Sequence, residues 1–331
     1  MTGGLGFIGS HTTVELQNAG HEVVIIDDLS NSRPEVLDGI AAITGVSPEF
    51  VKMDLRDKEV VSRFFQERKI DGVIHFAASK AVGESVENPL LYYENNIASL
   101  VYLLKSMIDN GVRSFIFSSS CTVYGQADEL PITEHAPVKK AESPYGNTKQ
   151  IGEEILQDLT RVEELNAIAL RYFNPIGAHE SAHIGELPIG VPQNLIPFVT
   201  QTAAGIREQL SVFGDDYPTA DGTAIRDYIH VVDLAKAHIA ALERLMQGKN
   251  KSRMEVFNVG TGTGSSVLEV IRAFEEVSGT RLNYKIVERR EGDITAAYAD
   301  TSLANSELGW KAELDLKDAL RAAWKWQKKQ Q

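Results

Sequence analysis

A tyrosine and a lysine that could together transfer a proton stand four residues apart, at Tyr145 and Lys149. Residues at this spacing share one face of a helix, which brings an ammonium group close to a phenol. A free tyrosine has a pKa of about 10, and about 4 kcal/mol of preferential stabilisation of the phenolate brings it near neutrality. One cation about 4 Å away, at an effective dielectric constant near 20, supplies roughly that much. The pair therefore predicts a tyrosine that acts as a general base, although tyrosine and lysine at this spacing are also common as a surface pair.

The first residues of the chain have the glycine spacing of a dinucleotide-binding loop. Gly3, Gly6 and Gly9 would permit a tight turn, a close approach of backbone to a pyrophosphate, and close helix packing. A helix near residues 8–19 would then point its N-terminus at the phosphates. Asp27 ends an apolar run 18 positions after Gly9, near the offset at which a carboxylate binds the hydroxyls of adenosine ribose. A glycine cluster is often only a turn, but together with Asp27 it predicts a dinucleotide site.

The composition is that of a soluble globular protein. The 331 residues are 43% hydrophobic and 24% charged, and the net charge of −13 comes without any lysine- or arginine-rich run, so no nucleic-acid partner is expected. The single cysteine, Cys121, cannot form an internal disulfide, and no cluster of ligands indicates a metal, which fits a reducing compartment. No apolar run of about 18 residues and no basic leader is apparent, so we expect a cytoplasmic protein without a membrane partner.

The elements that must position these residues alternate between strands and helices. Strands are expected near residues 22–27, 49–53, 72–77, 114–118 and 166–171, and helices near residues 8–19, 34–43, 58–68, 88–110 and 143–164. This alternation predicts an α/β protein with a doubly wound, mostly parallel, Rossmann-like sheet. In the strand order 3-2-1-4-5-6 the first strand is central. Only Met1 and Thr2 precede the glycine loop, so the first strand looks missing, and we expect about 5 to 8 further apolar residues upstream.

The second half of the chain has shorter elements. We expect a dinucleotide-binding domain at residues 1–173 and a smaller substrate-binding lobe at residues 174–331, over the carboxyl ends of the strands. The helices near residues 88–110 and 143–164 could form the two-helix face of a homodimer, although apolar helix stripes usually serve the core.

Several motifs resemble those of the extended short-chain dehydrogenase/reductases and, within them, the UDP-glucose 4-epimerase (UDP-galactose 4-epimerase) family. The broader resemblance rests on the glycine loop, Asp27, the serines at 118–120 and the Tyr145 and Lys149 pair. The closer one rests on residues 171–177 (RYFNPIG), 222–230 (GTAIRDYIH) and 258–262 (NVGTG). It implies an enzyme that interconverts UDP-glucose and UDP-galactose by transient oxidation at sugar carbon 4, with tightly bound NAD.

The resemblance implies catalytic roles for three residues. Tyr145 would be the general base and acid on the sugar 4-hydroxyl. Lys149 would lower the tyrosine pKa and bind the nicotinamide ribose. Ser120 would hydrogen-bond the same sugar oxygen, although a serine there is otherwise typical of a turn or a helix cap.

The resemblance also implies two groups of binding residues. The NAD site would comprise Gly3, Gly6, Phe7, Ile8, Gly9, Asp27, Asn31, Ser32, Asp54, Leu55, Phe76, Ala77, Ala78, Lys80, Asn95, Tyr145, Lys149 and Phe173. The UDP-sugar site would comprise Lys80, Ser120, Tyr145, Asn174, Asn194, Arg226, Arg290, Asp293 and Ala297. Arg226 and Arg290 would clamp the diphosphate, since guanidinium forks match phosphate oxygens, and Asp293 would bind the uridine ribose.

Ala297 stands where epimerases restricted to UDP-glucose and UDP-galactose carry a tyrosine that resembles a gate. Gly292 and Asp293 on one side, and residues 299–300 on the other, fix this register. Alanine there leaves room beside the sugar 2-position, so we expect UDP-N-acetylglucosamine and UDP-N-acetylgalactosamine to be accepted as well, because such specificity rests on steric exclusion. The alternative is that Tyr298 fills the gap or, with the register slipped by one, is itself the gate.

Three alternative functions require residues that can be compared with this sequence. A nucleotide-sugar 4,6-dehydratase would need an acid pair after the serine position, and Cys121 and Thr122 follow Ser120 instead. A decarboxylase acting on a uronic acid is less firmly excluded. A non-enzymatic NAD-binding sensor is disfavoured because Tyr145 and Lys149 are both present.

Overall fold

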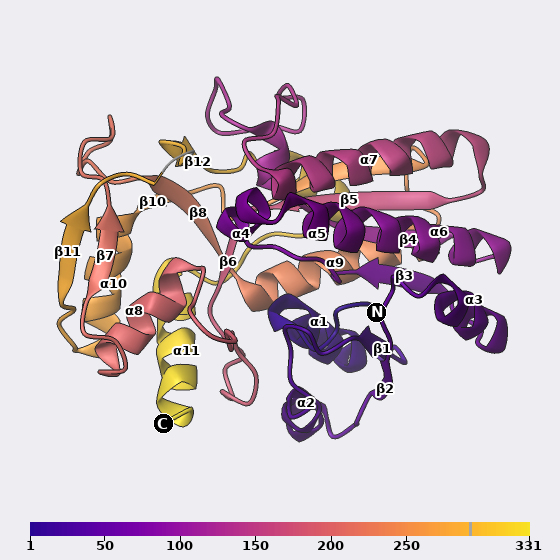
Figure 1. The fold of residues 1–331 in the computed structure, drawn as a ribbon, viewed down its shortest axis with the longest axis horizontal. Coiled ribbons are helices and arrows are strands. Elements are labelled where there is room, and N and C mark those ends of the chain that lie inside the picture. Colours follow the sequence, from indigo (N-terminus) through magenta and orange to yellow (C-terminus); the bar gives the residue numbers. More distant parts are fainter. Residues whose placement is uncertain (291–292) are drawn as a thin grey trace.

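The fold is seen in a computed structural model that describes residues 1–290 and 293–331. A parallel sheet organises the larger part of the chain (Figure 1). Its strands are β1 (Val24–Asp27), β2 (Glu49–Lys52), β3 (Gly72–His75), β4 (Ser114–Ser120), β5 (Asn166–Tyr172) and β9 (Met254–Val259). They pair in parallel as β1-β2 and β3-β4-β5-β9. The predicted α/β class is confirmed.

The first residues of the chain join the two halves of this sheet. Thr2 forms parallel bridges with Ile26 of β1 and with His75 of β3. The N–H of Phe76 donates to the Thr2 carbonyl at 3.0 Å. The order is therefore β2-β1-Thr2-β3-β4-β5-β9, which is the predicted order 3-2-1-4-5-6 with β9 added at one edge.

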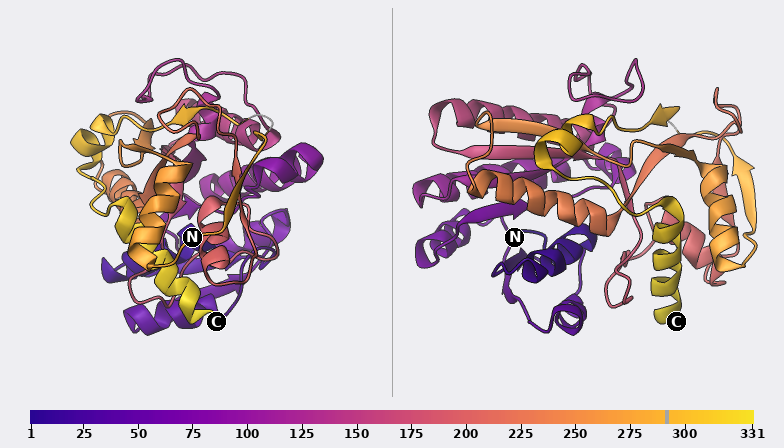
Figure 2. Two further views of the ribbon diagram at one scale, coloured as in Figure 1. Left: turned by 90° about the vertical axis from the view of Figure 1, so that its left-hand side faces the viewer. Right: turned by 180° about the vertical axis from the view of Figure 1, so that it is seen from behind.

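Helices cover both faces of the sheet (Figures 1 and 2). One face carries α1 (Phe7–Asn18), α2 (Val36–Thr44) and α9 (Val231–Met246), and the other carries α3 (Lys58–Glu67), α6 (Ser99–Asp109) and α7 (Pro144–Val162). Burial of the two apolar layers is the main force that holds the helices on the sheet. In the described part of the chain, no helix is both long enough and apolar enough to span a bilayer.

The long helix predicted over residues 88–110 is divided. After α4 (Val82–Glu87), helix α5 (Pro89–Tyr93) leads into a π-helical turn at Glu94–Ala98, and only then does α6 begin. Single π turns inside helices are frequent at functional sites. Apolar periodicity did not predict the turn because the turn inserts one residue without interrupting the helix.

A smaller lobe is built from the C-terminal half. Its strands are β6 (Asn174–Ile176), β7 (Leu210–Phe213), β8 (Ile225–His230), β10 (Gly264–Ser266), β11 (Tyr284–Val287) and β12 (Ala296–Ala297), and its helices are α8 (Leu195–Ala203), α10 (Val267–Ser278) and α11 (Leu316–Lys329). Strands β10, β8, β12 and β6 form one sheet, and β7 pairs with β11. The unpredicted strands β6, β10 and β12 are too short to show an alternating pattern. The division at residues 173 and 174 stays a prediction, and β9 and α9 cross it by returning to the larger sheet.

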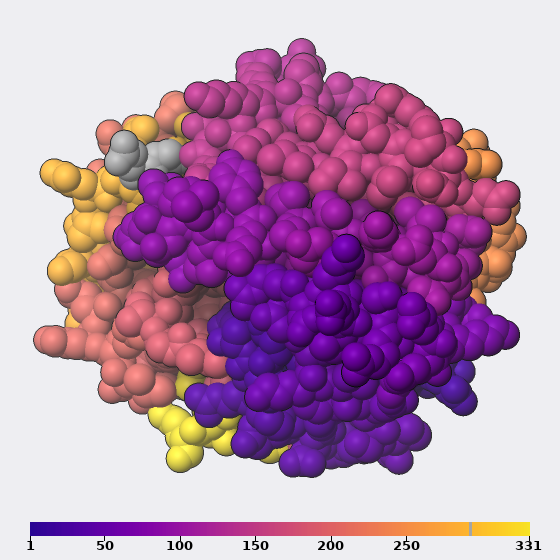
Figure 3. Space-filling model, turned by 45° about the vertical axis from the view of Figure 1, so that its right-hand side comes forward, coloured from indigo at the N-terminus to yellow at the C-terminus, as the bar shows by residue number. Residues whose placement is uncertain are grey.

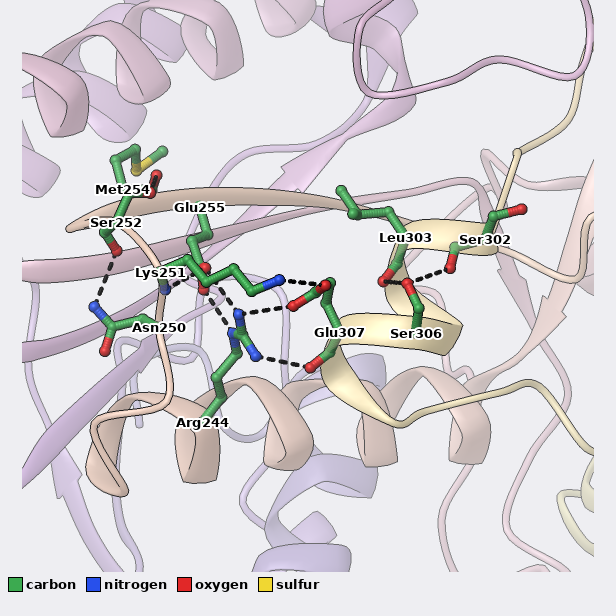
Figure 4. A network of polar contacts seen from close by, with 10 residues as sticks. All are labelled: Arg244, Asn250, Lys251, Ser252, Met254, Glu255, Ser302, Leu303, Ser306 and Glu307. Atoms are coloured by element: carbon green, nitrogen blue, oxygen red, sulfur yellow. Dashed lines mark hydrogen bonds and ion pairs between the residues drawn. The ribbon is translucent and has the colours of Figure 1, made fainter.

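An ion-pair network covers the outer side of β9, the last strand of the larger sheet (Figure 4). Arg244 of α9, whose side chain is 7% exposed, pairs with Glu255 of β9 at 2.7 Å and with Glu307 at 3.4 Å. Glu307 belongs to a π-helical turn at Ala304–Leu308 and also pairs with Lys251 at 2.6 Å. Breaking a buried pair is costly, so the network fixes this turn to the sheet. Charges beside an edge strand also oppose pairing with another chain.

Candidate active site

The three predicted catalytic residues meet at the carboxyl ends of β4 and β5. Helix α7 begins where it does because the hydroxyl of Ser143 caps its first turn and Pro144 follows. This start places Tyr145 in the first turn and Lys149 one turn later, both buried. Ser120 ends β4, and its side chain lies near enough to Tyr145 to lower the pKa of the tyrosine.

Burial dominates the electrostatics of the pair. It raises the pKa of Tyr145 well above its usual range, against the hydrogen bond with Ser120, which lowers it. Burial also lowers the pKa of Lys149 to about 8. The lysine Nζ lies 5.8 Å from the centre of the Tyr145 ring and donates to the Ser118 carbonyl at 2.7 Å. The lysine is thus near the tyrosine as predicted, but the tyrosine pKa is shifted in the opposite direction, because desolvation of the phenolate outweighs the other effects.

The serines at the end of β4 have different partners. The hydroxyl of Ser119 donates to Glu153 at 2.5 Å, which ties the strand to α7. The hydroxyl of Ser120 accepts from the N–H of Thr122 at 3.2 Å and so also caps the short 3₁₀ turn at Cys121–Tyr124. Both interpretations of Ser120, turn residue and site residue, are compatible with this geometry.

The glycine loop packs tightly against the end of β3. Gly3 has a φ of +66°, and a Cβ there would lie 2.7 Å from the backbone nitrogen of Ala77. A Cβ at Gly9 would overlap the Gly3 carbonyl. Only glycine fits both positions, and the space that it leaves is a backbone-lined cradle at the N-terminus of α1.

Asp27 fixes the conformation of this loop. Its carboxylate accepts from the N–H of Leu5 at 3.1 Å, from the N–H of Leu29 at 3.0 Å and from the hydroxyl of Ser32 at 2.7 Å. A carboxylate has about four acceptor positions. Asp27 therefore anchors the loop and retains the capacity to accept a ribose hydroxyl.

The other predicted NAD residues gather at the same edge of the sheet. Phe7 and Ile8 open α1, Asn31 and Ser32 follow β1, Asp54 and Leu55 follow β2, Phe76, Ala77 and Ala78 follow β3, and Phe173 follows β5. The ring of Phe76 packs on His238 of α9 with centres 4.6 Å apart. The structure thus brings together residues that are scattered over the first 173 positions.

The π-helical turn at Glu94–Ala98 presents two asparagines to this edge. The side chain of Asn95, predicted from the sequence, donates to the hydroxyl of Ser79 at 2.9 Å. The side chain of Asn96, which was missed, accepts from the N–H of Ser79 at 2.8 Å and donates to Thr148 at 3.0 Å. Asn96 thereby fixes the segment after β3 to α7 beside Lys149. Its only signal in the sequence was the position next to Asn95.

Two of the predicted substrate residues form an ion pair. Arg226 of β8 pairs with Asp293. The guanidinium of Arg290 lies over the ring of Phe213 at 4.1 Å, whereas Arg289 pairs with an aspartate of a neighbouring loop at 2.6 Å. The N–H of Asp293 donates to the Arg290 carbonyl at 3.3 Å, so Asp293 contacts Arg226 through its side chain and Arg290 through its backbone. A bound anion would compete with Asp293 for Arg226.

Lys80 and Asn194 converge on a glutamate that the sequence did not single out. The Nζ of Lys80 lies 4.0 Å from Glu186, and the side chain of Asn194 donates to the same oxygen at 2.6 Å. Burial raises the pKa of Glu186, and Lys80 opposes this effect. Asn174 lies elsewhere, at the start of β6 and opposite Tyr228.

Ala297 lies on β12 and is buried in an apolar cluster with Phe173. Successive strand residues face opposite sides. Tyr298 accordingly points to β10, where a Cβ on Gly264 would lie 3.0 Å from its ring. Gly292, used to fix the register, lies outside the described residues. Ala297 thus belongs to the same apolar cluster as Phe173, whereas the Tyr298 ring lies against β10.

A buried carboxylate joins two of the sequence motifs. Asp227 accepts from the N–H and the hydroxyl of Thr261 at 2.8 and 2.6 Å, from the N–H of Gly262 at 3.1 Å and from the N–H of Ala299 at 3.2 Å. Burial raises its pKa, and these hydrogen bonds oppose the shift. Asp227 therefore holds β8, the segment at 258–262 and the segment after Ala297 together. Only the position next to Arg226 could have indicated this role from the sequence.

Comparison with known proteins identifies the family. A family model described as GDP-mannose 4,6 dehydratase matches residues 1–323. The UDP-glucose 4-epimerase of Bacillus subtilis (strain 168) is 52% identical over 328 residues, which cover 99% of this chain and 96% of that protein. This chain belongs to the UDP-glucose 4-epimerase family.

Solved epimerase structures share the whole fold. The structure of the Stenotrophomonas maltophila epimerase with bound NAD and formylated UDP-arabinopyranose is 52% identical and aligns with a TM-score of 0.96, covering 99% of this chain and 97% of that one. The epimerase of Bifidobacterium longum in complex with NAD+ and UDP is 49% identical, with a TM-score of 0.95 and the same coverage. The extended dehydrogenase/reductase resemblance is thereby confirmed at the level of the epimerase family.

Proposed function

We propose that this protein interconverts UDP-glucose and UDP-galactose by transient oxidation at sugar carbon 4, with NAD retained through turnover. The observation that carries the proposal is the meeting of Tyr145, Lys149 and Ser120 at the sheet edge that also holds the glycine loop. We infer the reaction that these residues catalyse from the membership of the chain in the epimerase family. Conversion of UDP-galactose to UDP-glucose by the purified protein tests it.

The residues present fit NAD. The cradle at Gly3 and Gly9 brings backbone N–H groups and the N-terminus of α1 toward a pyrophosphate. Asp27 would bind the adenosine ribose, and Lys149 the nicotinamide ribose. Bound NAD supplies a hydride acceptor and donor beside the sugar, together with the positive charge of its oxidised ring.

Side chains of the protein transfer the proton of the sugar 4-hydroxyl. Tyr145 takes it from the 4-hydroxyl and later returns it, while Ser120 hydrogen-bonds the same sugar oxygen. Since burial raises the pKa of Tyr145, its phenolate needs positive charge nearby. The ammonium of Lys149 provides part of that charge, and the oxidised cofactor adds to it.

Binding of the diphosphate uses the pair of arginines around Asp293. Arg226 is neutralised by Asp293 in the structure, and the phosphate oxygens would replace that carboxylate. The exchange releases Asp293 to bind the uridine ribose. Arg290 would approach from the other side, and Asn174, Asn194 and Lys80 would contact sugar or phosphate oxygens.

We also propose that the protein forms a homodimer through the face made by α5, α6 and α7 (Figure 3). Several large apolar side chains on these helices are exposed, among them Leu90 at 81% exposure, Leu91, Val101 and Val162. Exposed apolar surface of this kind can be buried in an interface between two copies of the chain.

A wider substrate range follows from Ala297. The alanine faces the cluster with Phe173, and a phenol ring in its place would fill that side of the pocket. We expect the protein to interconvert UDP-N-acetylglucosamine and UDP-N-acetylgalactosamine too. Ala297→Tyr should remove this activity selectively, which an assay of both sugar pairs measures. A wild-type protein without N-acetyl activity would end this part of the proposal.

A further inference from the structure

A carboxylate with little exposure to solvent, Glu153, lies one helical turn beyond Lys149 on α7. Tyr145, Lys149 and Glu153 follow one another at four-residue intervals and so share one face of the helix. The Glu153 carboxylate, 11% exposed, accepts the hydroxyl of Ser119 at 2.5 Å. It thereby connects the helix that carries the proposed base to the strand that carries Ser120.

Arg171 of β5 completes this cluster. Its Nη2 lies 2.5 Å from Glu153 Oε2 and its Nε 2.9 Å from Oε1, with the arginine side chain 7% exposed. Its guanidinium lies 4.8 Å from the ring of Tyr124, whose hydroxyl donates to Asn258 of β9 at 2.6 Å. Bidentate, buried charge pairs hold a defined geometry. The Glu153 carboxylate is therefore fixed relative to three strands of the sheet.

Few charged groups face Lys149. Helix α7 contributes Tyr145 and Glu153, β3 contributes His75, and β4 contributes the Ser118 carbonyl and the Phe117 ring. Arg171 and Tyr172 of β5 lie one contact further away, Arg171 against Glu153 and Tyr172 against the Ser118 hydroxyl. Burial keeps His75 neutral by lowering its pKa to about 3, and it raises the pKa of Tyr172 to about 12. In the described part of the chain, Glu153 is the anion that faces the lysine.

Loss of the Glu153 charge would leave Lys149 and Arg171 as two cations in one buried cluster. An arginine does not release its proton in proteins. A buried lysine does so readily when positive charge is near. The lysine would therefore lose its proton at a lower pH, and its hydrogen bond to the Ser118 carbonyl would become an uncharged and weaker one.

We propose that Glu153 is a positioning residue for the catalytic pair, which keeps Lys149 charged and holds it against the strand end that carries Ser120. The proposal rests on the proton-transfer role proposed for Tyr145 and Lys149. A neutral lysine does not stabilise the Tyr145 phenolate. The acidic limb of the pH–rate profile then moves to higher pH.

The first test compares the pH dependence of kcat in wild type, Glu153→Gln and Glu153→Gln/Arg171→Gln. We expect Glu153→Gln to move the acidic limb upward by about one pH unit or more, which is about a tenfold loss of rate at a fixed acidic pH. The double variant also lacks the Arg171 guanidinium, the second cation near Glu153. The acidic limb of its pH–rate profile should therefore lie between those of wild type and Glu153→Gln. If both variants keep the wild-type limb, or if the double variant is shifted at least as far as the single one, the proposal is overturned.

The second test follows the Lys149 ammonium directly, by NMR titration of protein with ¹⁵N-labelled lysine, assigned with Lys149→Met. A lower titration midpoint in Glu153→Gln than in wild type supports the proposal, and an unchanged midpoint overturns it. No substrate is needed, so the result is independent of the proposed function. Wild-type protein without epimerase activity would contradict that function and leave the titration valid.

Glu153→Asp covers the case in which the glutamine variant does not fold. It keeps the charge on a side chain that is one methylene shorter. We expect a lower kcat with the acidic limb near that of wild type. An aspartate variant whose limb moves upward by about one unit would overturn the charge role.

Discussion

Among single residues, Tyr145 is the one whose buried hydroxyl must lose a proton during turnover, although burial raises its pKa. Tyr145→Phe should lower kcat by roughly 10²- to 10⁴-fold, the usual contribution of a general base, and leave NAD bound. Lys149→Met removes the cation beside the phenolate, so the acidic limb of the pH–rate profile should move upward. Steady-state rates across pH, with a cofactor assay of each purified variant, measure both effects. An unchanged profile for Lys149→Met would contradict the pairing.

Asp27 sets the expected choice of cofactor. A carboxylate at the ribose would repel a 2′-phosphate, so we expect NAD to bind about tenfold or more tightly than NADP. Arg33 lies nearby in the sequence and could reduce the difference. Asp27→Asn keeps an acceptor for the loop N–H groups and removes the charge. It should therefore reduce the preference for NAD over NADP. Equal affinity of the wild-type protein for the two cofactors, measured by titration, would count against this assignment.

Sequence reasoning found the residues whose partners lie nearby in the chain. Tyr145 and Lys149 share one helical face, and Asp27 stands at a fixed distance from the glycines, so spacing indicated them and the family motifs implied their roles. Glu186 contacts Lys80 and Asp227 contacts Thr261, both far away in the sequence, and spacing could not show those contacts. The burial of Tyr145, which raises its pKa in the protein without cofactor, was not predicted, because no local pattern reports burial.

At the scale of elements, helix α7 is placed by its close approach to β4. A Cβ on Gly152 would lie 2.6 Å from the Cζ of Phe117. Gly152→Ala should therefore destabilise the protein by about 1–3 kcal/mol, as overpacking does. It should also lower kcat, because α7 carries Tyr145 and Lys149. Denaturant midpoints and steady-state rates measure the two effects.

Gly83→Ala is the matched control for this variant. Gly83 also lies in a helix, α4, but a Cβ there would meet nothing within 4 Å. The change should have no cost and should raise stability by up to about 1 kcal/mol, because alanine favours helix. If the two variants are equally stable, the close contact at Phe117 does not place α7.

Helices and strands were predictable where their hydrophobic pattern extends over several residues. The spans of α7, β2 and β5 agree with the sequence pattern to within two residues. The π-helical turn at Glu94–Ala98 and the two-residue strand β12 were not predictable, since tertiary contacts and not local pattern define them. These are also elements that carry proposed site residues, Asn95 and Ala297.

At the scale of the whole molecule, the exposed apolar face of α5, α6 and α7 predicts a dimer. Light scattering during size-exclusion chromatography should give twice the chain mass for the wild-type protein. Val101→Asp places a charge on that face and should give a monomer. Val46→Asp, at an exposed valine in another part of the surface, should leave the dimer intact. A monomeric wild-type protein would refute the interface.

The sheet shows what the sequence could and could not reveal of the whole chain. The alternation of strands and helices predicted the parallel order, and Thr2 lies in the central position expected for the first strand. The return of α9 and β9 to the larger sheet was not predicted. No residue pattern in β5 or β9 predicts that these two strands pair, since both have ordinary apolar strand sequences.

The most direct measurement of the central claim is the conversion of UDP-galactose by the purified protein without an added oxidant or reductant. UDP-glucose should appear, the same mixture should be reached from either sugar, and no NADH should accumulate, because hydride and proton both return to the substrate. Tyr145→Phe, assayed in parallel, should show almost no conversion. A folded wild-type protein that holds NAD and yields no UDP-glucose would contradict the account.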